Sequence, residues 1–417
     1  MLHRTVIALF LLLPAAHLYA QAPAYDARTG RLQSLTKAEL QPLEGYLQTG
    51  PVALVEFADT DHDELPAIHV ATIVHASAAA LMTIIEKPEA YPKFLRTLDQ
   101  VDIADRKPDS LAYDWRWNMA LLSLKGRNLM TWYAPPANRP EAGYRVTIDS
   151  QSGDLGTGRI SIRVLPRGDR ESMLVVSMRI DLRTANYVAR RLALAARSIN
   201  RTANMALTFA MSLGFRREAE RRAGYTAPAR TADALHKPLL DERAMLPLLV
   251  RGDIVVLDMS RDALNQVAVF GLINEPQARV RKVLMDSDSF GSALMPGSAA
   301  TLVSRNGSLA TFDWTIDLPL VGVSGRMTML DNNPLVTVDA VDGAMQGGRW
   351  NFDTKALTKT VTLTSGWASF DLRKSTWFVR ALWDADPFLG HGMSAASELM
   401  LMRALRSRAS PDDEQKR

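Results

Sequence analysis

Few residues of this sequence have a type and spacing that support catalysis or metal binding. Cysteine is absent, which excludes disulfides, thiolate metal sites and cysteine nucleophiles. No HExxH, G-x-S-x-G, P-loop or Rossmann glycine pattern is present. The run Asp61-His62-Asp63-Glu64 could attract a divalent cation, but we interpret it as a solvated loop because a metal site needs ligands from several elements. The sequence therefore predicts no catalytic residue, no metal and no cofactor.

Aromatic and methionine side chains instead recur at alternate positions, the spacing that places them on one face of a strand. Tyr113, Trp115 and Trp117 share one face, and Asp114 lies on the opposite one. Such side chains bury ligand carbon, at roughly 25 cal/mol per Å², but offer little acid–base chemistry. The sequence thus favours binding over catalysis. The predicted ligand-binding residues are Tyr113, Trp115, Trp117, Met130, Trp132, Trp314, Met329, Trp350 and Phe352.

An internal repeat sets the organisation of the chain. Residues 113–130 align without a gap on residues 312–329, and six of the 18 pairs are identical. Further matches follow in the same order, and they include Val146-Thr147-Ile148-Asp149 with Val336-Thr337-Val338-Asp339, Gly158-Arg159 with Gly348-Arg349, and Asp181-Leu182-Arg183 with Asp371-Leu372-Arg373. Ordered matches of this kind indicate two diverged copies of one domain.

Charged residues are repeated as well: Asp114 with Asp313, Arg127 with Arg326, and Arg159 with Arg349. The alternation places Asp114 and Arg159 on the face opposite the aromatic side chains. We therefore interpret the repeated residues as cross-strand ion pairs rather than as site residues. The glycines that precede Arg127 and Arg159 are where a turn or bulge would need them.

The periodicity predicts an antiparallel α+β domain in each copy. In the first copy it indicates a strand near 68–74, a helix over 77–95, about six strands up to Arg183, and a long helix from near Tyr187. A curved sheet and a long helix, each with one apolar face, bury those faces against each other. Alanines along the helix leave room for an apolar cavity, unless aromatic and methionine side chains fill it.

This order of elements resembles the START-like, or SRPBCC, helix-grip superfamily, which includes lipid-transfer domains, polyketide cyclase/dehydrase domains and ubiquinone-binding proteins. The end of the first helix, Glu89-Ala90-Tyr91-Pro92-Lys93-Phe94-Leu95, is similar to the exit of that family's first helix. The resemblance implies two tandem helix-grip domains, each with a curved antiparallel sheet around a long C-terminal helix and a cavity for a hydrophobic ligand. It does not specify whether the ligand is carried or chemically altered.

The chain divides into a signal peptide over 1–20, a disordered segment over 21–34, a first domain over 35–223, a linker over 224–231, a second domain over 232–409 and a disordered tail over 410–417. The signal peptide is predicted from a basic start, a short apolar run and the small residue Ala20. It predicts export to the periplasm, with secretion as the alternative. In the second copy, residues 384–392 are expected to interrupt the last helix, as a loop or as a gate.

The leading hypothesis is binding or transfer of a lipid, an acyl chain or a polycyclic, polyketide-like molecule, with transient membrane contact. One alternative is a cyclase/dehydrase-type enzyme, which would need a pair of polar side chains in the cavity. Another is a scaffold with filled cores. The net charge of +4, with scattered basic residues, gives no indication of nucleic-acid binding. The oligomeric state is left open.

Overall fold

The computed structural model describes residues 32, 35–56, 67–119, 122–187, 190–191, 197–228, 234–286, 298–317 and 322–410. The predicted signal peptide and the run Asp61–Glu64 lie outside the described residues, as do most of the two predicted disordered ends, the end of the predicted linker and most of the first turns of the long helix expected from Tyr187. Within the described ranges, no helix is both long and apolar enough to cross a membrane.

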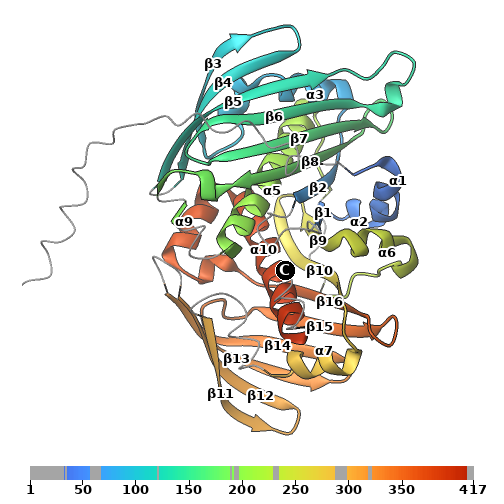
Figure 1. Ribbon diagram of the computed structural model, residues 1–417, viewed down its shortest axis with the longest axis vertical. Coiled ribbons are helices and arrows are strands. Elements are labelled where there is room, and N and C mark those ends of the chain that lie inside the picture. The colour runs from blue at the N-terminus through green and yellow to red at the C-terminus, as the bar shows by residue number, and fades with distance from the viewer. Residues whose placement is uncertain are drawn as a thin grey trace, which may run out of the picture.

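The two halves of the chain have the same order of elements (Figure 1). The first half contains β1 (Val52–Glu56), β2 (Ala67–Val74), α3 (Ala78–Ile85), β3 (Leu98–Arg106), β4 (Ser110–Met119), β5 (Leu122–Tyr133), β6 (Tyr144–Gly153), β7 (Thr157–Pro166), β8 (Ser172–Asp181) and α5 (Arg197–Arg222). The second contains β9 (Gly252–Ser260), β10 (Ala263–Ile273), α7 (Gln277–Leu284), β11 (Ser298–Asn306), β12 (Leu309–Asp317), β13 (Gly322–Asn332), β14 (Leu335–Gly343), β15 (Arg349–Ala356), β16 (Thr362–Ser369), α9 (Trp377–Ala385) and α10 (Pro387–Ala409). The predicted α+β class and the tandem helix-grip arrangement are confirmed.

The strands of both halves form one 16-stranded sheet. Each half contributes its strands in the same order, from β1 out to β3 and from β9 out to β11, and the halves meet where β1 pairs antiparallel with β9. Leu54 lies opposite Ile254 at the centre of this pairing. The edge strand that each half would otherwise expose is therefore covered by the other half.

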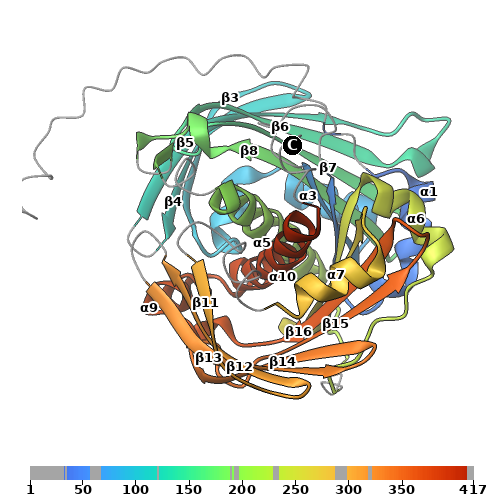
Figure 2. The same ribbon diagram turned by 60° about the horizontal axis from the view of Figure 1, so that its bottom comes forward.

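The long helices α5 and α10 pack against each other inside the curve of the sheet (Figure 2). The contact is close at Gly392 of α10, where a Cβ atom would lie 2.5 Å from the Cα of Ala206 in α5. A glycine is needed there because any side chain would push the two helices apart. The concave face of the sheet is thus filled by a pair of helices that touch each other.

The convex face carries a second, smaller core at the junction of the halves. Short helices α1 (Lys37–Leu40) and α2 (Glu44–Leu47) pack there together with α6 (Glu242–Arg251). Their apolar side chains bury the outward-facing residues of the central strands, such as Leu54 and Ile254. Strands β1, β2, β9 and β10 are therefore covered on both faces, which explains why they are apolar at consecutive positions.

The first helix is shorter than its predicted span of 77–95. Ser77 caps α3 by accepting a hydrogen bond from the Ala80 amide, and the α-helix ends at Ile85. A 3-10 helix over Pro88–Lys93 follows. Pro88 and Pro92 cannot donate the backbone hydrogen bonds that a continuous α-helix requires, so the chain turns instead toward β3.

The break in the last helix is also shorter than the predicted 384–392. Only Asp386 lies between α9 and α10, and Pro387 occupies the first turn of α10, where its missing N–H is tolerated. The helix therefore resumes at Pro387, inside the predicted interruption. Gly390 lies within α10, and a glycine is needed there because a Cβ would lie 2.1 Å from the Trp383 indole. The glycines are required for packing and do not end the helix.

Candidate functional site

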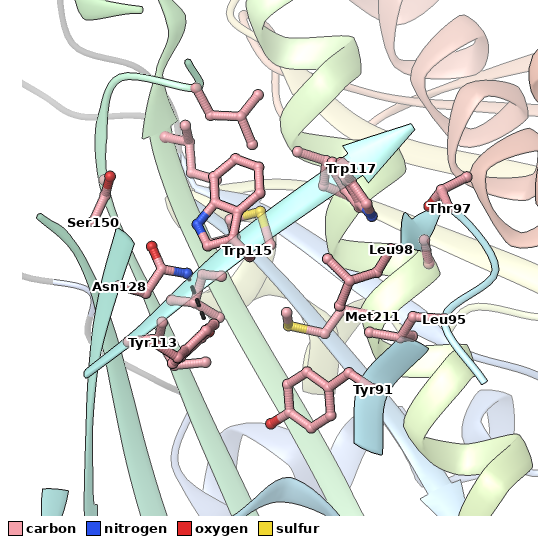
Figure 3. Close-up of a pocket in the computed structure, with 18 of the residues that line it drawn as sticks. Tyr91, Leu95, Thr97, Leu98, Tyr113, Trp115, Trp117, Asn128, Ser150 and Met211 are labelled. Atoms are coloured by element: carbon pink, nitrogen blue, oxygen red, sulfur yellow. Dashed lines mark hydrogen bonds between the residues drawn. The ribbon is translucent and has the colours of Figure 1, made fainter. Parts of the chain in front are cut away.

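A pocket lies between α5 and the concave face of the sheet in the first half (Figure 3). It contains about 860 Å³ of space that no atom occupies, part of it open to solvent. Strands β3 to β8 and helix α5 all contribute side chains. The lining residues are Tyr91, Leu95, Thr97, Leu98, Tyr113, Trp115, Trp117, Asn128, Ile148, Ser150, Leu155, Gly156, Gly158, Ile160, Met178, Ile180, Leu207, Ala210, Met211 and Asp386.

Three predicted ligand-binding residues line this pocket, namely Tyr113, Trp115 and Trp117 of β4. Met130 of β5 is fully buried, Trp132 of β5 is half-buried, and neither lines the pocket. The predicted residues of the second half are buried in its core; they are Trp314, Met329, Trp350 and Phe352. A ligand-binding role for all nine stays a prediction.

Polar groups lie at two ends of the pocket. At one end, the Asn128 amide donates to the Tyr113 hydroxyl over 3.1 Å, and Ser150 lies beside this pair (Figure 3). Burial raises the pKa of Tyr113 to about 12, so its hydroxyl is neutral at ordinary pH. At the other end Trp117 and Thr97 lie together (Figure 3).

The indole N–H groups of Trp115 and Trp117 have no hydrogen-bond partner in the described part of the chain. A buried N–H without an acceptor costs free energy, on the order of 1–3 kcal/mol. Both indoles line the pocket. The two nitrogen atoms are themselves covered by protein, so an oxygen of a bound molecule would reach them only after a side chain moves.

A carboxyl group from the second half also lines the pocket. Asp386 is 4% exposed, and its Oδ1 accepts a hydrogen bond from the Phe388 amide over 2.9 Å. Burial raises the pKa of Asp386, although the charges of Arg96 and Arg217 partly oppose this effect. Sequence analysis missed Asp386 because an Asp-Pro pair indicates a helix start but not which surface that helix contacts.

The core of the second half contains a different buried acid. Glu398 of α10 is fully buried, and within the described ranges neither of its carboxyl oxygens has a hydrogen-bond partner of ordinary length. Burial raises the pKa of Glu398 to about 8, and the nearby Trp350 indole opposes this only in part. The carboxyl is therefore largely protonated at neutral pH. Glu398 was not among the predicted site residues.

A serine, a histidine and a carboxylate meet on the convex side of the sheet. His69 Nδ1 lies 2.8 Å from Ser177 Oγ, and its Nε2 lies 3.2 Å from Glu56 Oε2. These are the residue types of a hydrolase triad, but the two imidazole nitrogens are exchanged, because a triad serine bonds Nε2 and the triad carboxylate bonds Nδ1. Ser177 is fully buried and outside the pocket, however, and Arg251 of α6 holds Glu56 over 2.7 Å. We interpret the cluster as a structural link between the two halves.

The repeated charged residues form the predicted cross-strand ion pairs. Arg127 binds Asp114 over 2.7 Å, and Arg159 binds Asp149 over 2.5 Å. The second half repeats both pairs, Arg326 with Asp313 and Arg349 with Asp339. All four lie on the outer face, away from the pocket, where ion pairs stabilise the fold only weakly.

The glycine before Arg127 has a role in addition to the predicted turn or bulge. Gly126 lies opposite Trp115, and a Cβ there would lie 2.5 Å from the indole. Gly325 lies opposite Trp314 in the same way. The repeated Asp-Trp and Gly-Arg pairs are thus one cross-strand unit, with the ion pair on the outer face and the indole over the glycine on the inner face.

The described residues contain no cluster of three or more histidine, aspartate or glutamate side chains that could hold a metal ion. No family model matches the sequence, and no curated protein matches it.

The chain is similar to several solved structures. The di-domain aromatase/cyclase StfQ of the steffimycin biosynthetic pathway is 12% identical, with 83% of this chain and 99% of that chain covered and a TM-score of 0.29. A START superfamily protein from Mycobacterium smegmatis is 17% identical, with 37% and 98% covered and a TM-score of 0.30. The human StarD13 lipid transfer and protein localization domain is 13% identical, with 45% and 98% covered and a TM-score of 0.31. These scores are too low for a ligand or an activity to be transferred.

Proposed function

We propose that the chain binds or transfers an apolar small molecule, held in the pocket between α5 and the sheet of the first half. The observation that carries this proposal is the pocket itself: an open space in the domain core, lined mainly by aromatic and aliphatic side chains. A few polar groups at its ends would orient the bound molecule. Such a combination is typical of small-molecule sites.

The driving force is the removal of ligand carbon from water. A ligand that buries 200 Å² of apolar surface would gain roughly 5 kcal/mol before the costs of association are subtracted. Trp115 and Trp117 supply flat apolar surface with little conformational freedom to lose. Met211 can adapt its shape to different ligands.

We further propose that the protein acts in the periplasm. The support is the sequence of residues 1–20, with its basic start, short apolar run and small residue before Gln21. Amino-terminal sequencing of protein recovered from a periplasmic extract tests this proposal. A start at Gln21 is expected, and a start at Met1 in the cytoplasmic fraction would contradict it.

A filled-pocket variant tests the binding function. Ala210 lines the pocket, so Ala210→Leu places three additional carbons where the ligand would lie. Ala395 of α10 is a fully buried alanine of the core outside the pocket lining, and Ala395→Leu is the matched control. Overpacking a filled core costs typically 1–3 kcal/mol.

The measurement combines thermal unfolding with native mass spectrometry of protein purified without detergent. We expect the wild type to carry a reproducible ligand mass, and Ala210→Leu to lose this mass while its unfolding temperature stays near or above that of the ligand-free wild type. Ala395→Leu should lower the unfolding temperature. Equal destabilisation by both variants, with no ligand mass in the wild type, would favour the scaffold with filled cores.

A second candidate function is cyclase/dehydrase-type acid–base chemistry on the bound molecule. The pair of polar side chains that it requires is present, because Asp386 and Tyr113 both line the pocket. Burial raises the pKa of the Asp386 carboxyl, which favours its protonated, proton-donating form relative to an exposed aspartate. If this function is correct, wild-type protein and Asp386→Asn should release ligands that differ by the mass of one water molecule.

A further inference from the structure

The pocket of the first half is completed by a residue of the second half. Asp386 is 4% exposed and lines the pocket, although it belongs to the junction of α9 and α10. Its Oδ1 caps α10, and no described residue hydrogen-bonds its Oδ2. One carboxyl oxygen is therefore left for a bound molecule.

Packing between the two long helices holds Asp386 at this place. Gly392 of α10 contacts the backbone of α5 at Ala206. The next residues of the same α5 segment, Leu207 and Ala210, line the pocket. The close helix contact thus brings the start of α10 beside the part of α5 that faces the ligand space (Figure 2).

The surroundings of Asp386 disfavour a charged ligand group. Arg96 and Arg217 are the cations that act on its charge, so an ammonium group would meet two guanidinium groups. A carboxylate would be attracted by these guanidinium groups, but the Asp386 carboxylate would repel it. A hydroxyl group is neutral, and it can donate to a carboxylate or accept from a carboxylic acid.

The indoles of the pocket agree with an oxygen-bearing ligand. Trp115 is 9% exposed, and its N–H finds no acceptor among the described residues; the N–H of Trp117 is in the same situation. Both nitrogen atoms are covered by protein, so an oxygen of the ligand would satisfy one of these donors only after a side chain moves. Trp117 lies opposite Leu98, next to Thr97, at the end of the pocket where Figure 3 shows these side chains together.

We propose that Asp386 is the hydrogen-bonding anchor of the pocket, and that the ligand is a neutral apolar molecule that bears a hydroxyl group. This inference rests on the proposed binding function. It makes the second half a part of the binding site of the first half.

Calorimetric titration of the full mature chain with naphthalene, naphthol and naphthoate tests the proposal. These probes share one apolar skeleton and differ in the polar group. We expect naphthol to bind at least about fivefold more tightly than naphthalene, the ratio for one net hydrogen bond. Naphthoate should bind more weakly than naphthol.

Variants at Asp386 separate anchoring from folding. Serine is a good helix cap but too short to reach the ligand, so Asp386→Ser should bind naphthol and naphthalene equally, with naphthalene affinity unchanged. Asp386→Asn keeps both the cap and a hydrogen-bonding group, and should retain the preference for naphthol. Asp241 caps α6 outside the pocket, and Asp241→Ser is the matched control for a change of cap.

The outcomes distinguish this inference from the proposed function. If the wild type binds naphthalene and naphthol equally, or if Asp386→Ser keeps the full preference for naphthol, Asp386 is not the anchor, although the pocket still binds apolar molecules. Tighter binding of naphthoate than of naphthol would overturn the assigned ligand class. Failure of the folded wild type to bind any of the three probes would contradict the binding function, and this inference with it.

Discussion

The buried carboxyl of Glu398 should make the stability of the protein fall as pH rises. Burial raises the pKa of Glu398 from an ordinary value of 4.5 to about 8 in the folded chain. Between these two values the folded state holds a proton that the unfolded state has lost. Stability is therefore fully present below about pH 4.5, decreases through this window, and levels off above pH 8.

The size of the effect follows from the two pKa values. Each pH unit in the window changes the free energy of unfolding by about 1.4 kcal/mol, so the loss from pH 5 to pH 8 is roughly 3–4 kcal/mol. The substitution Glu398→Gln removes the ionisation and keeps the size of the side chain. Burying the glutamine amide has a free-energy cost of its own, but this cost does not depend on pH. The test is therefore how the difference in free energy of unfolding between Glu398→Gln and wild type changes with pH.

Urea unfolding followed by circular dichroism at pH 5, 6.5 and 8 measures this difference. We expect Glu398→Gln to gain roughly 3–4 kcal/mol relative to wild type between the two extremes. The exposed Glu141, changed to glutamine, serves as control and should follow the wild type at every pH. A difference between Glu398→Gln and wild type that stays constant from pH 5 to pH 8 would refute the reasoning.

Three further predictions concern the sheet and the junction of the halves. Arg251→Met removes a half-buried guanidinium that binds two carboxylates of the first half, and should lower the free energy of unfolding by about 2 kcal/mol. Arg326→Met removes one member of an exposed pair and should have a much smaller effect in the same chemical denaturation. Gly126→Ala places a methyl group 2.5 Å from an indole ring, so it should cost at least about 2 kcal/mol in urea unfolding, and an unchanged midpoint would show that the ring can move aside. Val256→Pro, in the strand β9 that pairs with the other half, should prevent folding of both halves, since proline removes a backbone donor and clashes within a central strand; limited proteolysis that leaves the first half intact would contradict this.

The sequence allowed the strands and their faces to be predicted because alternation depends only on neighbouring residues. Tyr113 and Trp115 face inward and Arg116 outward, as the period-2 pattern requires. The repeated ion pairs could be predicted for the same reason. The first helix was predicted too long because apolar residues recur up to Leu95, and the pattern alone does not weigh the two prolines that end it.

The pairing of β1 with β9 could not be predicted. It joins residues about 200 positions apart through backbone hydrogen bonds, and these leave no recognisable pattern of side chains in the sequence. The place of Asp386 depends on the same kind of contact. Its Asp-Pro sequence specifies a helix start, but the pocket it enters is determined by Gly392 packing on α5. Sequence reasoning about one copy at a time therefore missed the only acid that lines the described pocket.

These contacts also bear on why two copies are present in one chain. Two domains joined only by a linker would each expose an edge strand, β1 or β9, and each would leave one side of its long helix uncovered. Here each edge is covered by the other half, and α5 and α10 cover each other. Because the copies share a sheet and a helix interface, a substitution in one copy can add a side chain to the pocket of the other. Asp386 is an example, because it caps the first turn of α10 and brings a carboxyl group of the second half to the pocket of the first half. Under the proposed binding function, the two halves are therefore different parts of one binding unit.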